Sequence, residues 1–143
     1  MISDAEKRDA KLLEQLEACR DLWQGAKNVA LPVIGDSALY ATGSYLYDVW
    51  RMIEPEIELA LVPGISAHQL AASRAGKFIA MAEEVLSIIP CTGDGEKIKK
   101  ALAAADSAAL YKPSALGESL RETVEACGPW RRMIRVDHAG LAD

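Results

Sequence analysis

The stretch "VALPVIGDSALYATGSYLYDVW" (residues 29–50) decides how the fold is interpreted. It joins an apolar run (29–34) to residues whose apolar positions recur at helical spacing. The run predicts a buried strand, and Pro32 within it favours an edge or distorted position because proline has no N–H to donate. The chain is therefore expected to turn from strand straight into helix at Gly-Asp-Ser (35–37). Such a corner is either an ordinary connection between a strand and a helix or the floor of a ligand site.

Strand-like and helix-like runs alternate along the rest of the chain. Strands followed by helices of about 10–15 residues predict an α/β fold of parts of two small domains with mainly parallel strands. Residues 76–84 have no clean period, so we expect one partial domain over 1–82 and a second over 83–143. Further strands are expected at 57–62, 85–90, 107–111 and 131–136, and helices at 3–24, 39–53, 66–75, 96–105 and 115–127.

The composition indicates a compact protein with an acidic balance. Of the 143 residues, 50% are hydrophobic and 26% are charged, which is enough apolar material for a core. A net charge of -5 argues against a general nucleic-acid binder, which would show a basic face. Three cysteines without a Cys-x-x-Cys pair, and two histidines, indicate neither a disulfide framework nor a metal site. No apolar run reaches membrane-spanning length, so we expect no membrane contact and a cytoplasmic location.

Two corners follow expected strands, where open parallel sheets bind ligands. "IGDS" (34–37) follows the first strand and "PGIS" (63–66) follows the second. Gly35 would let another group approach the backbone closely. Asp36 is either a helix N-cap or a carboxylate that faces the crevice, and Ser66 is either a cap or part of a helix N-terminus that receives a carboxylate. Taken singly, both residues are more often plain caps.

The other polar candidates carry a weaker signal. His68 lies just inside a helix near the same crevice, yet a single helical histidine usually faces solvent or is satisfied locally. His138 has no partner at metal-ligand spacing. The "TGDG" loop (92–95) is better explained by a turn plus a cap than by phosphate binding, because the Gly-Lys-Ser/Thr ending is missing. Catalysis by a Ser-His-Asp or Cys-His arrangement is not indicated.

The order of these motifs resembles the tetrapyrrole methylase family, and most closely its precorrin-2 or cobalt-factor II C20-methyltransferases. The resemblance rests on "GDSALYATGSYL" (35–46), on "PGIS" followed by "SIIP" (87–90), and on "ADSAALYKPSALGESLRETVEACG" (105–128). It covers nearly the whole chain, through "IRVDHAGLAD" (134–143).

The resemblance implies a function, a cofactor and an assembly. Members of the family use S-adenosylmethionine as methyl donor, bound in a cleft between two α/β domains, usually within a homodimer. An electron-rich ring carbon of a tetrapyrrole attacks the sulfonium methyl, so the chemistry needs alignment and exclusion of water rather than an enzyme nucleophile. Carried over by motif, the donor-binding residues would be Gly35, Asp36, Ile65, Ser66, Ala67, Tyr111 and Ala139.

The sequence also departs from the family pattern. It begins at a helix that the family places inside its first domain, lacks the opening strand with its Gly-rich loop, and stops before the last strands of the second domain. Tyr111 stands where the family often has methionine, and "SAH" (66–68) replaces a Ser/Thr-Ser pair. We therefore expect a truncated precorrin-2 or cobalt-factor II C20-methyltransferase. The alternatives are a non-catalytic remnant that self-associates and binds S-adenosylhomocysteine, and a methylase for another ring position.

Overall fold

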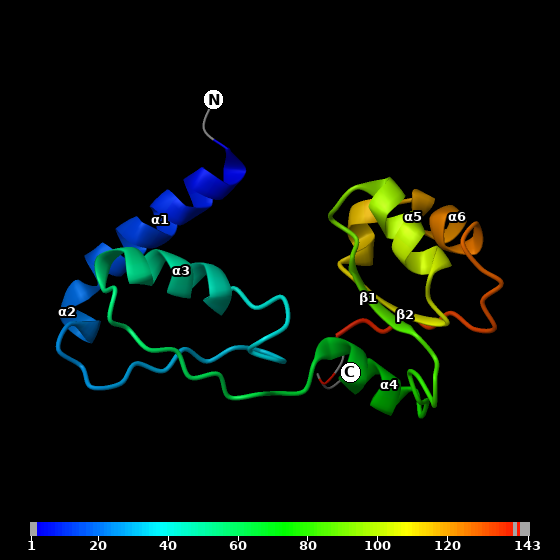
Figure 1. The fold of residues 1–143 in the computed structure, drawn as a ribbon, viewed down its shortest axis with the longest axis horizontal. Helices are drawn as coiled ribbons and strands as arrows, with labels where there is room; N and C mark the ends of the chain where they lie inside the picture. The colour runs from blue at the N-terminus through cyan, green and yellow to red at the C-terminus, as the bar shows by residue number, and fades with distance from the viewer. Residues whose placement is uncertain (1–2, 139, 141–143) are drawn as a thin grey trace. The chain divides into compact units, whose positions relative to one another are not determined.

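The computed structural model describes residues 3–138 and 140 (Figure 1). The chain divides into two compact units, Met1–Ser66 and Ala67–Asp143, called here the first and second units. The boundary between the domains predicted from the sequence, at 82/83, lies inside the second unit. That division concerns the domains of the family, and it stays a prediction.

The first unit is built on helices that begin where the sequence has capping residues. Helix α1 (Asp4–Ala18) opens with a capping box, in which the Ser3 hydroxyl accepts from the Glu6 N–H and the Glu6 carboxylate accepts from the Ser3 N–H. The Ser-x-x-Glu spacing of residues 3–6 predicts such a box, and the structure confirms it. Helix α2 (Arg20–Trp23) follows directly, and α3 (Gly43–Ile53) packs on α1.

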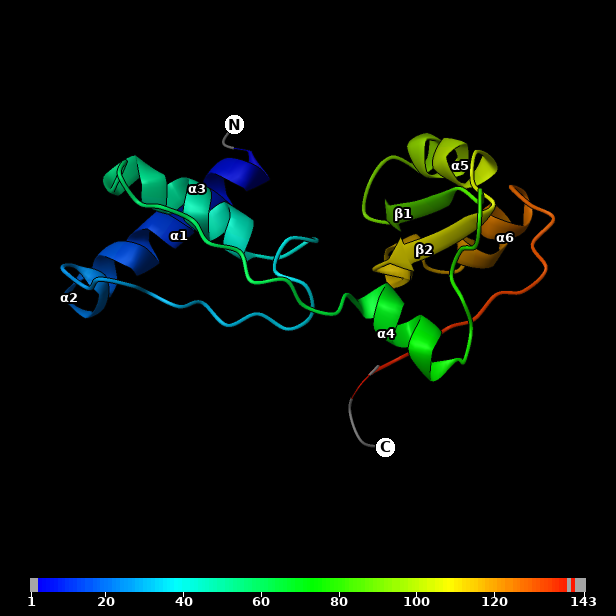
Figure 2. The same cartoon turned by 60° about the horizontal axis from the view of Figure 1, so that its bottom comes forward.

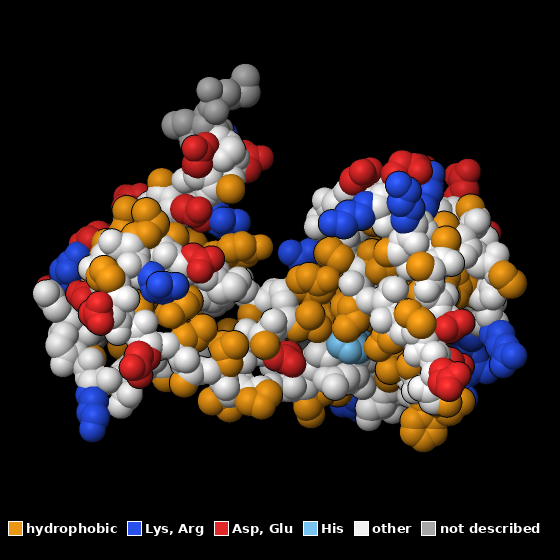
Figure 3. Space-filling view, in the orientation of Figure 1, with side chains coloured by type: hydrophobic (Ala, Val, Ile, Leu, Met, Phe, Trp, Pro, Cys, Tyr) orange, Lys and Arg blue, Asp and Glu red, His pale blue; other side chains and the backbone are white. Residues whose placement is uncertain are grey.

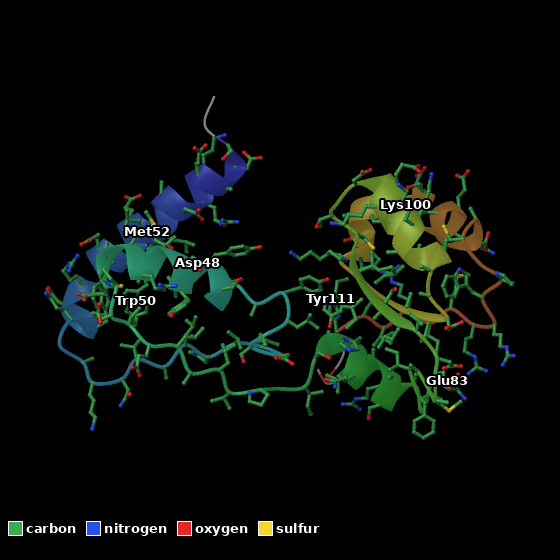
Figure 4. All side chains as sticks on the ribbon, viewed as in Figure 1. Asp48, Trp50, Met52, Glu83, Lys100 and Tyr111 are labelled. Carbon is green, nitrogen blue, oxygen red and sulfur yellow. The ribbon has the colours of Figure 1, made fainter. Side chains whose placement is uncertain are left out.

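Two tryptophans close the small core of the first unit. The indole N–H of Trp23 donates to the Leu16 carbonyl oxygen at 2.9 Å, which ties α2 back to α1. Trp50, labelled on α3 in Figure 4, is the second tryptophan. Its ring meets that of Trp23 edge to face, with the centroids 5.2 Å apart. Leu16, Trp23 and Val49 are buried, so this end of the unit is held by apolar packing.

Three of the expected strands do not form. Residues 29–34, 57–62 and 131–136 are irregular. Most of their large apolar side chains are exposed rather than buried. A strand needs a neighbour for its N–H and C=O groups, and within the described residues the ladder of paired strands lies elsewhere. The turn into α3 is also longer than expected, because the helix begins at Gly43 and not directly after 35–37.

The second unit contains the sheet. Strands β1 (Leu86–Pro90) and β2 (Ser107–Tyr111) pair in parallel, with Ile88 opposite Ala109, and α5 (Gly95–Ala103) connects them. Figure 2 shows α5 on one side of the strands and α4 (Ala67–Arg74) on the other. This β–α–β arrangement confirms the α/β class.

The core of the second unit lies on the α5 side of the sheet. It joins Ile89 and Cys91 to Ile98 and Leu102 of α5 and to Val124 of α6 (Ser119–Glu125). A short 3₁₀ helix, η1 (Pro113–Leu116), leads from β2 to α6.

The loop at 92–95 and the length of the helices can be compared with what the sequence predicts. Asp94 is the N-cap of α5 and accepts from the Glu96 N–H, so the loop at 92–95 is a turn plus a cap, as predicted. No helix in the described part of the chain is long and apolar enough to span a membrane.

Candidate functional site

The two predicted corners lie against each other within the first unit. Gly35 has a φ of +91°, which lies in the left-handed region that favours glycine. A Cβ at Gly64 would overlap the carbonyl oxygen of Gly35, and a Cβ at Gly35 would lie 3.7 Å from the carbonyl oxygen of Ile65. The backbones at 35 and 64 therefore approach more closely than side chains would allow. We call this contact the glycine corner.

A side-chain hydrogen bond fastens the glycine corner. The Ser37 hydroxyl donates to the Val62 carbonyl oxygen at 2.7 Å, although the two residues are 25 positions apart. The corner thus joins the ends of the two segments, 29–34 and 57–62, that were expected to be strands. The structure brings the backbones of Gly35 and Ile65 close together, although in the part of the chain that is described no strand precedes either corner.

Asp36 is held by its own loop rather than by the following helix. Its Oδ1 accepts from the Ala38 N–H at 2.8 Å, which makes an Asx turn, whereas the N-cap of α3 is Thr42. The cap alternative for Asp36 is therefore wrong. The carboxylate is half-buried, and in the described ranges no ion pair involves it.

A hollow opens beside Asp36 in the first unit. It has a volume of about 410 Å³ and a mostly apolar lining that comes from α1, the loop before α3, and α3 itself. Tyr40 lies in this lining with a φ of +52°, a conformation that costs a non-glycine residue of the order of 1–3 kcal/mol. The polar residues that line the hollow include Asp36, Tyr40 and Thr42.

The "PGIS" corner ends in one exposed and one buried residue. Ile65 is 65% exposed, whereas Ser66 is 3% exposed and is a buried polar residue. Ala67 then begins α4 in the second unit. Ile65 and Ser66, which the resemblance assigns to the donor site, directly follow Gly64 of the glycine corner in the sequence.

In the second unit Tyr111 meets a histidine from a distant part of the sequence. Tyr111 is the last residue of β2, and its hydroxyl oxygen lies 2.8 Å from the Nδ1 atom of His68. The same oxygen accepts from the backbone N–H of His68 at 3.4 Å, and the two rings meet edge to face. Spacing along the sequence gave no sign of this pair, because its members are 43 residues apart.

The backbone turns sharply after β2. Lys112 has a φ of 53° and a ψ of 48°, so the chain leaves the sheet in the left-handed conformation at the residue after Tyr111. The Tyr111 carbonyl oxygen accepts from the Cys91 N–H at 2.9 Å, which keeps the ends of β1 and β2 together. Burial raises the pKa of the Cys91 thiol, so this cysteine stays protonated at neutral pH.

The remaining predicted residues add little. Ala139 lies outside the described residues. Among the residues that are described, no group of three His, Cys, Asp or Glu side chains could hold a metal ion.

A family model and the curated relatives both connect this chain with tetrapyrrole methylation or cobalamin biosynthesis. The family model for Tetrapyrrole (Corrin/Porphyrin) Methylases matches residues 1–143. A cobalt-precorrin-2 C(20)-methyltransferase from Salmonella typhimurium is 30% identical over 112 residues, which cover 78% of this chain and 46% of that protein. The cobalamin biosynthesis protein CobIJ from Mycobacterium bovis is 26% identical over 116 residues, which cover 81% of this chain and 22% of that protein. The chain thus spans less than half the length of the curated relatives that it matches.

Proposed function

Because the chain belongs to the tetrapyrrole methylase family, we propose that it binds S-adenosylmethionine and acts in C-methylation of a tetrapyrrole in cobalamin biosynthesis. The names of its relatives support this proposal, since one is a C20-methyltransferase and another is a cobalamin biosynthesis protein. The specific reaction that we propose is methylation of precorrin-2 or cobalt-factor II at C20.

The glycine corner carries the proposal. The absence of Cβ atoms at Gly35 and Gly64 lets the loops at 34–37 and 63–66, which the motifs assign to the donor, pack against each other. Asp36 adds a carboxylate at the same corner, which suits the amino or hydroxyl hydrogens of a donor molecule. The residues present therefore fit the cofactor that the family implies.

In the proposed reaction the cofactor supplies the reactive group and the protein binds and orients it. S-adenosylmethionine supplies the electrophilic methyl group. The residues that we propose to bind and orient the donor are those carried over by motif: Gly35, Asp36, Ile65, Ser66, Ala67, Tyr111 and Ala139. Holding two reactants in line and keeping water away is a sufficient catalytic task when the nucleophile belongs to the substrate.

Substitutions of Asp36 test the proposal. Asp36→Asn keeps an oxygen for the Ala38 N–H but removes the charge, so the loop should stay folded while the donor loses a charge-assisted hydrogen bond. We expect S-adenosylhomocysteine to bind about tenfold more weakly or worse, with an unchanged melting temperature. Asp36→Ala should lower both the affinity and the stability.

A matched control separates donor binding from capping. Asp94→Asn changes a carboxylate that also accepts from a backbone N–H two residues on, in a loop to which we assign no donor contact. Its affinity for S-adenosylhomocysteine should equal that of the unchanged chain. If Asp36→Asn also binds like the unchanged chain, Asp36 has no role in donor binding.

A second candidate function is binding without catalysis. The apolar side chains of 29–34 and 57–62 are largely exposed, so the part of the chain described has an uncovered surface beside the glycine corner. A protein of this kind would bind S-adenosylhomocysteine and self-associate but transfer no methyl group. Saturable binding with no methylated tetrapyrrole in a turnover assay would favour this candidate.

A further inference from the structure

We infer that His68 is a positioning residue, which holds the Tyr111 hydroxyl in the place where the methyl donor binds. The inference rests on the proposed function, and it adds a residue to which the family pattern gives no role. It starts from the contact between the Tyr111 hydroxyl and the Nδ1 atom of His68, at 2.8 Å.

The two residues satisfy each other's polar groups. Tyr111 and His68 are both half-buried, and a hydroxyl or imidazole nitrogen taken out of water needs a hydrogen-bond partner. The backbone N–H of His68 lies in the first turn of α4, where N–H groups have no partner within the helix. The Tyr111 oxygen accepts from this N–H as well, at 3.4 Å. The start of α4 and the end of β2 are therefore fastened through one oxygen atom.

The strand places Tyr111 away from the core of the second unit. Side chains alternate across a strand, and Ala108 and Leu110 pack with the α5 core, so Tyr111 belongs to the opposite face. Figure 2 shows α4, which carries His68, on that side of the sheet. The phenol thus emerges at the carboxyl end of a parallel strand, where open parallel sheets bind ligands.

A held side chain binds a ligand better than a mobile one. A tyrosine ring that must be ordered on binding loses rotamer freedom at that moment, whereas a ring already fixed by His68 does not. The left-handed turn at Lys112 also removes the chain from the edge of the sheet directly after Tyr111. His68 should therefore affect the affinity for the donor through Tyr111 and not by touching the donor itself.

A double-mutant cycle tests this coupling. S-adenosylhomocysteine is titrated into the unchanged chain, His68→Ala, Tyr111→Phe and the double variant, and folding of each is checked by thermal unfolding. We expect each single substitution to weaken binding about fivefold, and the double substitution to weaken it no further than either single one. His68→Asn should restore most of the affinity, because its amide reaches the position of Nδ1.

Two further measurements separate positioning from a merely structural role. The ¹⁵N shift of His68 Nδ1 should change in Tyr111→Phe, since the hydroxyl partner is lost. Tyr47→Phe is the matched control, because it also removes a hydrogen-bonded tyrosine hydroxyl, which in this case donates to the Ile57 carbonyl oxygen in the first unit. Its binding should equal that of the unchanged chain.

The outcomes distinguish this inference from the proposed function. If the unchanged chain binds and the losses of the two single variants multiply in the double variant, His68 does not act through Tyr111 and the inference is wrong. Unchanged affinity in His68→Ala has the same meaning. If the folded, unchanged chain does not bind S-adenosylhomocysteine, the proposed function fails, and this inference fails with it.

Discussion

Gly64 leaves less room for a Cβ than Gly35, the other glycine of the glycine corner. A Cβ there would overlap the carbonyl oxygen of Gly35, and backbone atoms cannot move aside as the end of a side chain can. The proposal requires this close approach, because it holds the loops at 34–37 and 63–66 together. A substitution at this residue therefore tests the geometry of the corner directly.

We expect Gly64→Ala to open the glycine corner. Overpacking of this kind costs about 1–3 kcal/mol, and affinity for S-adenosylhomocysteine should fall at least about tenfold because the corner changes shape. Thermal unfolding and calorimetric titration measure the two effects.

Gly93→Ala is the control for this experiment. A Cβ at Gly93 would have its nearest neighbour 3.9 Å away, at the Pro90 carbonyl oxygen, which is an ordinary contact. Its stability and binding should stay close to those of the unchanged chain. Equal behaviour of the two alanine variants would mean that the close approach at Gly64 has no importance.

Single residues were predicted well where their role is local. The sequence predicts that Ser3 is a helix cap and that the loop at Asp94 is a turn with a cap. Both predictions were possible because a cap and its partner lie within three residues of each other. The Tyr111–His68 pair could not be predicted, because its two members meet only after α4 and β2 have been placed.

The helices are the elements whose ends the sequence describes best. The capping box of α1 also makes this helix sensitive to pH, because one of its members is a carboxylate. The hydrogen bond from the Ser3 backbone N–H lowers the pKa of Glu6 below its ordinary value of 4.5.

The start of α1 should fray in acid. A carboxylate whose pKa is lowered by folding contributes stability that is present above its unfolded pKa and is lost as the pH falls through the folded value. Hydrogen exchange of the amides at Ser3, Glu6 and Lys7 should therefore be slow above pH 4.5 and should rise relative to the rest of α1 below it.

Glu6→Gln is the matched variant for this prediction. Glutamine also completes a capping box, but it has no proton to gain in this range. The variant should show no acid-induced rise in exchange at these three amides. An equal rise in the variant would mean that the fraying has another cause.

The strands were predicted less well than the helices, for a physical reason. Strands β1 and β2 form because α5 brings two apolar runs side by side and they pair in parallel. The runs at 29–34 and 57–62 are equally apolar, but an apolar run becomes a strand only when a neighbour takes its backbone hydrogen bonds. The sequence of a run gives its hydrophobicity and not its neighbours.

At the scale of the whole molecule, the exposed apolar residues of the first unit need an explanation. Val29, Leu31, Leu59 and Leu61 are each about half exposed, and Figure 3 shows orange side chains along the lower edge of this unit. Surfaces of this kind mark sites of association. We propose that the chain is a homodimer in which this surface is covered.

Charge at this surface should weaken the dimer. Leu61→Asp should raise the dissociation constant about tenfold or more, since burial of one leucine contributes about 1.5–3 kcal/mol and 1.4 kcal/mol is a factor of ten. Leu22→Asp is the control, because Leu22 is 84% exposed on α2 and does not belong to either segment. Sedimentation equilibrium measures both constants. Monomeric behaviour of the unchanged chain at all concentrations would contradict the dimer.

The central claim is that this chain, which matches less than half the length of its relatives, binds the methyl donor of its family. The most direct test is calorimetric titration of the purified chain with S-adenosylhomocysteine. The account predicts saturable binding with one site per chain, weakened in both Gly64→Ala and Asp36→Asn. No binding by the folded chain would contradict it, and the family resemblance would then record common ancestry without donor binding.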